Sequence, residues 1–126
     1  MNSRNSILRL KRFEAEEKAR KVEALESMIR DFDQMAQDLD RQILSEEERS
    51  GIRDPNHYAY STFAKSAAQR RNNLDASIDD LKAKLELAQR DYEDAAEEVR
   101  KAEAADLRDS ARTRRKTSRT PDLAVG

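Results

Sequence analysis

Cysteine and tryptophan are absent from this sequence of 126 residues, which has only two glycines, two prolines and 5% aromatic residues. Without cysteine, disulfides, thiolate metal ligands and thiol catalysis are excluded. So few turn formers and large apolar side chains argue against a layered core around an enclosed pocket. No signal peptide and no run of about eighteen apolar residues occurs, so we expect neither secretion nor membrane insertion.

Charged residues, by contrast, make up 40% of the chain, and the formal net charge is only -1. This composition is typical of long, solvated helices, and we predict one elongated all-α domain. The one histidine, His57, has no nucleophile motif beside it, and the sequence contains neither a phosphate-binding glycine loop nor a paired-histidine metal spacing. We therefore expect no catalysis, no cofactor and no metal.

The clearest pattern is a heptad repeat in the second half of the chain. Its apolar positions alternate in steps of four and three, and charged residues fill most of the positions between them. Such a repeat predicts a coiled-coil helix, which needs a partner helix to cover its apolar seam. The positions are Leu74, Ile78, Leu81, Leu85, Ala88, Tyr92, Ala95, Val99 and Ala102.

A second heptad seam precedes it, with Val22, Leu25, Ile29, Phe32, Ala36, Leu39 and Ile43, and it extends more weakly back to Leu8. Met28 and Met35 flank this seam, and we interpret them as packing residues. Seam cations Lys11, Lys18 and Arg71 are expected to lay their methylene groups on the seam with the charge in water.

Helix-stop signals separate the two seams. Gly51 is suited to follow a helix C-terminus, Asp54-Pro55 could begin the next helix, and Ser61 is a second N-cap candidate. We predict helix one over about 3–49, a turn over about 50–59 and helix two over about 60–108. Because the connection is short, an antiparallel two-helix coiled-coil hairpin follows.

Folding about Gly51 and Ile52 would place Leu8 near Ala95 to Ala102. The competing arrangement is an extended parallel dimer, which would carry Gly51 and Pro55 through its middle at a cost of about 3 kcal/mol or more per chain.

The last segment, 109–126, holds five basic residues between Arg112 and Arg119 without an acid among them, and we predict a disordered basic tail. In a hairpin, this tail lies beside the basic N-terminus. The combined positive end would attract an acidic partner, or serve only to keep the chain soluble. Its cations are Arg4, Arg9, Lys11, Arg12, Arg112, Arg114, Arg115 and Lys116.

Half of the aromatic residues, Tyr58, Tyr60 and Phe63, lie within six positions after the turn. They would either cap the hairpin core or form a docking surface for another protein.

The run HYAYSTFAKSAAQRRNNL, together with the N-terminal ILRLKRFEAEEKARKVEALE, resembles the FliJ family of flagellar export proteins, in particular its short alphaproteobacterial type. The similarity covers about 6–109. It implies a cytoplasmic, non-catalytic component of the type III export apparatus in flagellum biogenesis and motility, peripheral to the inner membrane at the flagellar base. Members form an antiparallel coiled coil that enters the hexameric export ATPase, promotes its activity, contacts the export-gate membrane protein and handles export chaperones.

By this resemblance, the basic end would bind the ATPase, and the face that begins at Phe63 would bind the gate. The expected gate-binding residues are Tyr60, Phe63, Ala67, Arg70 and Leu74. Two other functions compete with this one. The first is a nucleic-acid-associated protein that binds through the basic tail, and it is disfavoured because the chain has no aromatic stacking platform beside the tail. The second is a plain structural rod or adaptor.

Overall fold

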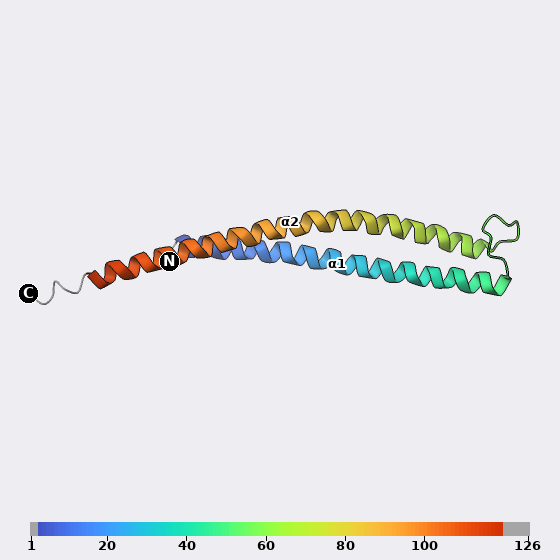
Figure 1. Ribbon diagram of the computed structural model, residues 1–126, viewed down its shortest axis with the longest axis horizontal. Helices are drawn as coiled ribbons and strands as arrows, with labels where there is room; N and C mark the ends of the chain where they lie inside the picture. Colours follow the sequence, from blue (N-terminus) through green and yellow to red (C-terminus); the bar gives the residue numbers. More distant parts are fainter. Residues whose placement is uncertain (1–2, 120–126) are drawn as a thin grey trace, which may run out of the picture. The chain divides into compact units, whose positions relative to one another are not determined.

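The computed structural model describes residues 3–119, and side chains as far as residue 116. It contains α1 (Ser3–Ser50) and α2 (Thr62–Arg119), joined by an irregular connection (Figure 1). The described residues form no strand, and the two helices pack against each other, which confirms the predicted all-α hairpin. The chain divides into two compact units: a turn unit, Val22–Leu87, and a terminal unit, made of Met1–Lys21 and Ala88–Gly126.

The core of the turn unit is the predicted heptad seam. Large aliphatic side chains from α1 meet alanine, isoleucine and leucine side chains from α2, and burial of such side chains is the main source of stability in a hairpin of this kind. The buried apolar residues of this unit are Leu25, Ile29, Ala36, Leu39, Ala64, Ala67, Ile78 and Leu81.

Polar contacts in the turn unit show that the helices run antiparallel. Arg71 Nη1 donates to Asp40 Oδ1 at 2.8 Å, and nearer the connection the Tyr60 hydroxyl donates to Glu47 Oε2 at 2.7 Å. The Arg71 side chain is 35% exposed, and its guanidinium is paired to Asp40, whereas the sequence predicted that its charge would lie in water. Its Nε atom is buried and has no hydrogen-bond partner within the described part of the chain.

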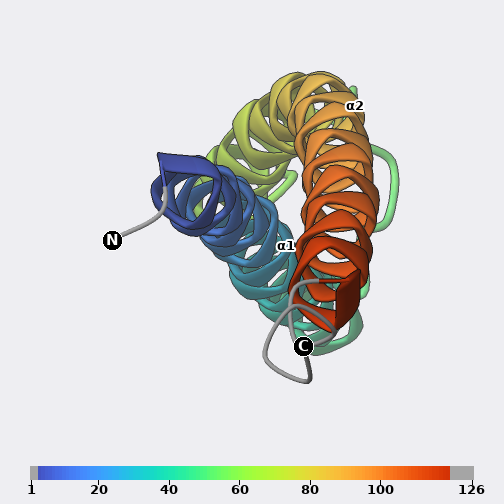
Figure 2. The ribbon, with the colours of Figure 1, turned by 90° about the vertical axis from the view of Figure 1, so that its left-hand side faces the viewer.

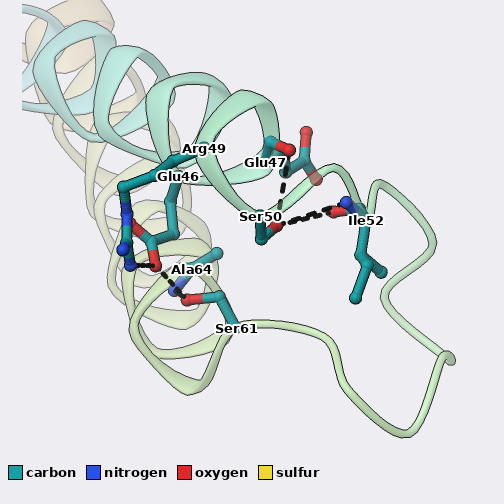
Figure 3. Close-up of polar contacts among 7 residues, drawn as sticks. All are labelled: Glu46, Glu47, Arg49, Ser50, Ile52, Ser61 and Ala64. Carbon is teal, nitrogen blue, oxygen red and sulfur yellow. Dashed lines mark hydrogen bonds and ion pairs between the residues drawn. The ribbon is translucent and has the colours of Figure 1, made fainter.

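Gly51 ends α1 as predicted. Its φ of 75° lies in the left-handed region that favours glycine, and its N–H donates to the Glu47 carbonyl at 2.9 Å. Asp54-Pro55 does not begin a helix, because Asp54 accepts hydrogen bonds from the N–H groups of Asn56 and His57 and forms a tight turn. The second candidate, Ser61, is the N-cap of α2 (Figure 3).

In the terminal unit, two ion pairs define the alignment of the helices. Arg4 lies 3.1 Å from Asp109, and Arg12 lies 3.8 Å from Glu103. Leu8 therefore lies opposite residues between 103 and 109, and its predicted position near Ala95 to Ala102 is wrong, because the facing stretch of α2 lies further toward the C-terminus. The reason is the connection, which continues to Ser61 and moves the centre of the hairpin beyond Gly51 and Ile52.

The predicted end of helix two is also wrong, because α2 continues through Asp109 to Arg119. Figures 1 and 2 show this end of α2 passing the start of α1. Arginine, lysine and alanine favour helix, and no glycine or proline interrupts this stretch, so local propensity extends the helix where charge density had suggested disorder. The remainder of the predicted tail, 120–126, lies outside the described residues.

Candidate partner-binding surfaces

Phe63, in the first turn of α2, is the most accessible large apolar residue of the predicted gate surface, with 56% of its side chain exposed. Beside it is an open hollow of about 450 Å³. Its other lining residues come from the last turns of α1 and are mostly polar, so the aromatic ring is the apolar part of this surface. They are Asp38, Arg41, Gln42, Ser45 and Glu46.

A neighbouring hollow of about 420 Å³ shares Asp38 and Gln42 with the first. Arg70 and Leu74, both predicted gate residues, line it from α2. Its remaining lining residues are Met35, Leu39 and Asn73. The two hollows together form a groove between the helices, called the turn-unit groove below. The groove has a mixed lining, with the apolar residues Met35, Leu39, Phe63 and Leu74 among polar and charged ones, so it offers a partner segment both apolar contacts and hydrogen bonds.

Two residues of the predicted gate surface are engaged within the hairpin. Ala67 is only 3% exposed and belongs to the seam, so its predicted accessibility is wrong. The reason is the heptad register, in which Ala67 lies four positions before the seam residue Arg71. Tyr60 is half-buried and bonded to Glu47. Of the five predicted gate residues, Phe63, Arg70 and Leu74 therefore line the groove.

Met35 is a groove residue that the sequence reading assigned to packing. Its side chain is 51% exposed and lines the hollow with Leu74, while Met28 is 44% exposed. Methionine adapts its shape to different partners, which suits a binding surface better than a core position. The sequence did contain a sign of this exposure, because both methionines lie one position before a seam residue, on the flank of the apolar stripe.

Hydrogen bonds fasten the start of α2 to the end of α1 (Figure 3). The Ser61 hydroxyl donates to Glu46 Oε1 at 3.0 Å and accepts the Ala64 N–H at 3.2 Å. The Arg49 guanidinium, followed by the Ser61 hydroxyl, lowers the pKa of the Glu46 carboxyl by hydrogen bonding. These contacts of Ser61 with Glu46 and Ala64, called the clamp below, hold the first turn of α2, and with it Phe63, in a defined position.

The three aromatic residues after the turn divide between the two predicted roles. Tyr60 caps the hairpin, and its hydrogen bond to Glu47 raises the pKa of the Tyr60 phenol. Tyr58 is 96% exposed and stacks on His57, with 4.6 Å between the ring centroids. His57 Nδ1 accepts the Ala59 N–H at 3.0 Å, so the imidazole helps to shape the connection. Of these three aromatic residues, Tyr58 and Phe63 are therefore exposed to a partner.

The terminal unit brings together the cations predicted to bind the ATPase. Arg4, Arg9, Lys11 and Arg12 lie in the first turns of α1, and Arg112, Arg114, Arg115 and Lys116 lie near the end of α2. All are exposed except Lys11, which is half-buried. Asp109 and Glu103 pair with Arg4 and Arg12, and Glu14 lies 3.9 Å from Lys11.

Next to these residues is an open hollow of about 370 Å³ between the helices of the terminal unit. Its lining combines three apolar residues with three arginines. The lining residues are Arg4, Ile7, Ala102, Ala105, Arg108 and Arg112. Arg9, Arg108 and Arg112 form no ion pair with any other side chain of the described residues. Their charges are therefore available to an anionic partner.

The geometry defines a two-helix hairpin with an aromatic groove in one unit and a cationic surface in the other. Comparison of the chain with models of protein families, with curated proteins and with solved structures found no match. No helix in the described part of the chain is long and apolar enough to cross a membrane.

Proposed function

We propose that this chain is a non-catalytic accessory protein of the flagellar type III export apparatus. In this proposal, the terminal unit binds the hexameric export ATPase and promotes its activity, and the turn unit binds the cytoplasmic part of the export gate. The protein works at the inner-membrane base of the flagellum. The supporting sequence feature is the resemblance of the aromatic turn and the following helix to the FliJ family.

One structural observation carries the ATPase half of the proposal. The basic residues of both chain ends lie in one unit, held there by the Arg4–Asp109 and Arg12–Glu103 ion pairs. A surface with several unpaired arginines attracts an acidic partner over a distance of about one Debye length, about 8–10 Å at physiological salt, and speeds its encounter. An acidic ring opening is such a partner.

The gate half rests on Phe63 and the turn-unit groove. An exposed aromatic ring beside a groove is typical of the anchor residues that dominate the energetics of protein interfaces. Phe63 extends from a turn that the Ser61 and Glu46 contacts hold in place, so little conformational entropy is lost when a partner binds.

The ATPase half is tested by titrating the export ATPase of the same organism with this protein and measuring the rate of hydrolysis. We expect stimulation that saturates near one chain per hexamer. The test variant carries Arg9→Gln, Arg112→Gln, Arg114→Gln and Lys116→Gln, and we expect it to lose most of the stimulation. Normal stimulation by this variant would contradict the assignment of the terminal surface.

A matched control removes the same number of cations from the turn unit. Arg30, Arg53, Lys65 and Lys82 are exposed and form no ion pair within the part of the chain that the structure describes. Their replacement by glutamine changes the net charge of the protein equally, so this variant should stimulate as the unaltered protein does. Equal loss in both variants would indicate a general charge effect.

The gate half is tested with Phe63→Ala in a binding titration against the cytoplasmic domain of the gate protein. Loss of a buried aromatic anchor costs about 2 kcal/mol or more, which is about a thirtyfold weaker affinity. Leu44→Ala is the control, because Leu44 is 57% exposed and lines neither hollow of the groove. Equal affinities of the two variants would show that Phe63 is not part of the interface with the gate protein.

A further inference from the structure

Three exposed large apolar residues on the α1 part of the terminal unit have no role in the proposed function. Ile7, Leu10 and Phe13, at steps of three along α1, are 52%, 54% and 55% exposed. Each step of three moves about 60° around the helix axis, so the three side chains span about 120° of the helix surface. We call this surface the apolar ridge.

The apolar ridge runs from the flank of α1 beside α2, where Ile7 lines the terminal hollow, to the side of α1 that faces away from α2. Leu8, which is 4% exposed, marks the side that packs on α2, and Leu10 follows it by about 200° around the helix. Ser6 and Glu14 share the ridge sector, and Glu14 is in an ion pair with Lys11. The ridge is therefore convex and open, and the hairpin core does not use it.

Cations border the apolar ridge on both sides. Arg9 follows Phe13 around the helix on one edge, while on the other edge Ile7 shares a hollow with Arg4, Arg108 and Arg112. Beyond this hollow the end of α2 adds Arg114, Arg115 and Lys116, all exposed. Arg4, Lys11 and Arg12 are each paired with a carboxylate, whereas Arg9, Arg108 and Arg112 form no ion pair with a side chain of the described residues.

We propose that the apolar ridge docks the terminal unit on an anionic lipid bilayer surface. An apolar stripe about 100° wide or more, with arginine and lysine beside it, is the pattern of helices that lie in the membrane interface. The three apolar side chains enter the boundary between headgroups and acyl chains, and the flanking guanidinium groups remain among the anionic headgroups. No helix has to cross the bilayer, and none in the described residues could.

A second copy of the chain fits this surface less well. A symmetric dimer through the ridge would bring the same arginines of both copies, including Arg9 and Arg108, close to one another. Like charges at the rim of an interface oppose association, whereas an anionic surface compensates them on both edges of the ridge. An acidic protein groove would satisfy the same charges, and it is one of the outcomes that the experiment separates.

The experiment measures binding of the full chain to vesicles of phosphatidylcholine with phosphatidylglycerol by flotation. The test variant combines Ile7→Ser, Leu10→Ser and Phe13→Ser. We expect the unaltered protein to bind and the variant to lose about 100-fold or more in partition coefficient. Binding should also be absent on vesicles of phosphatidylcholine alone and should fall as salt rises from about 0.1 M to about 1 M.

The matched control replaces three exposed apolar residues of the turn unit by serine. Met28, Leu44 and Leu87 are 44%, 57% and 60% exposed, so the loss of apolar surface and of helix propensity is comparable. Circular dichroism must show the same helix content for both variants. Equal vesicle binding by the unaltered protein and the ridge variant would overturn the proposal, as would equal loss in the control.

A second measurement does not depend on a triple variant. The chain has no tryptophan, so Phe13→Trp introduces a single fluorescent reporter at the ridge. Anionic vesicles should shift its emission to shorter wavelength as the indole enters the interface, and Phe63→Trp in the turn unit should show no shift. The absence of a shift at residue 13 would overturn the proposal.

Two further measurements test whether a second copy of the chain or an acidic protein covers the apolar ridge instead of lipid. The first is sedimentation velocity without lipid. A dimer that the ridge variant converts to a monomer would show that a second copy covers the ridge, and would overturn the lipid proposal. Loss of ATPase stimulation in the ridge variant, without vesicle binding by the unaltered protein, would place an acidic protein there instead. Because vesicle binding requires no ATPase, this inference and the proposed function can fail independently.

Discussion

The turn unit and the terminal unit are built from the same two helices but differ in their cores. Most of the buried apolar side chains among the described residues belong to the turn unit, and only Leu8 and Ala88 belong to the terminal unit. In the terminal unit, the seam positions hold Lys11, Ala15 and Lys18 instead of large aliphatic residues. Lys18 is exposed and Tyr92 is 39% exposed, although both occupy seam positions of the heptad.

This difference shows that a continuous heptad register does not imply a uniform core. The register aligns the side chains, but the free energy of packing depends on how much apolar surface each of them removes from water. Hairpin pairing in the terminal unit relies more on ion pairs such as Arg4–Asp109, and exposed pairs of this kind contribute about 1 kcal/mol or less. The terminal unit should therefore open more easily than the turn unit.

The largest expected effect comes from deleting a core side chain of the turn unit. Ile78 is 5% exposed, and Ile78→Ala should lower the free energy of unfolding by about 2–4 kcal/mol, measured by urea denaturation followed by circular dichroism. Leu8→Ala in the terminal unit should lower the same free energy by less, because that unit can open locally before the turn unit unfolds. Equal losses would show that the hairpin unfolds as one cooperative unit.

A smaller effect is expected at the end of α1. No atom lies within 4 Å of an added Cβ at Gly51, so Gly51→Ala tests the positive φ alone. The substitution should destabilise the turn unit by about 1 kcal/mol, measured as a decrease in melting temperature. Gly51→Asn is the control, because asparagine tolerates the left-handed region better and should cost less. A neutral Gly51→Ala would mean that the connection adjusts its backbone freely.

The difference in stability between the two units should become smaller when the terminal seam gains an apolar side chain. Lys11→Leu places an apolar side chain at a half-buried seam position, and we expect a local gain of about 1 kcal/mol. Hydrogen exchange should slow for amides of 3–21 and 88–119 and stay unchanged in the turn unit. Lys21→Leu, at an exposed position, should have little effect. Unchanged hydrogen exchange in both variants would indicate that the composition of the seam does not limit the stability of the terminal unit.

The smallest expected effect is a dependence on pH. The pKa of Glu46 lies below its ordinary value of 4.5, because Arg49 and then Ser61 hydrogen-bond to its carboxylate. A lowered folded-state pKa contributes stability above the unfolded pKa, and this stability is lost as the pH falls through the folded pKa. The melting temperature should therefore fall slightly below about pH 4.3, and less so in Glu46→Gln.

Glu97 provides the comparison in the terminal unit. Its pKa is also lowered, chiefly by the hydrogen bond from Arg100, but this pair lies within α2 and joins no second helix. Glu97→Gln should therefore change the acid sensitivity less than Glu46→Gln, whose carboxylate links α1 to Ser61 at the start of α2. The opposite order would show that the clamp does not contribute to hairpin stability.

The heptad steps and the two helix-end signals made most of the fold predictable. Glycine at position 51 and serine at position 61 act through local backbone geometry and hydrogen bonding, which sequence reveals directly. The exposure of Met35 was not predictable in the same way, whereas the heptad register already placed Ala67 on the seam. Exposure on the flank of the apolar stripe depends on where the partner helix lies, and a shift of one position moves a side chain about 100° around its helix.

The sequence by itself determined that this chain forms two long helices, where α1 ends, and which side chains form the seam, because these follow from periodicity and local propensity. Only the tertiary structure decided which residues face each other across the hairpin and which flanking residues line a groove. Those features depend on the length of the connection and on contacts between residues distant in sequence. The groove beside Phe63 and the apolar ridge became visible only through them.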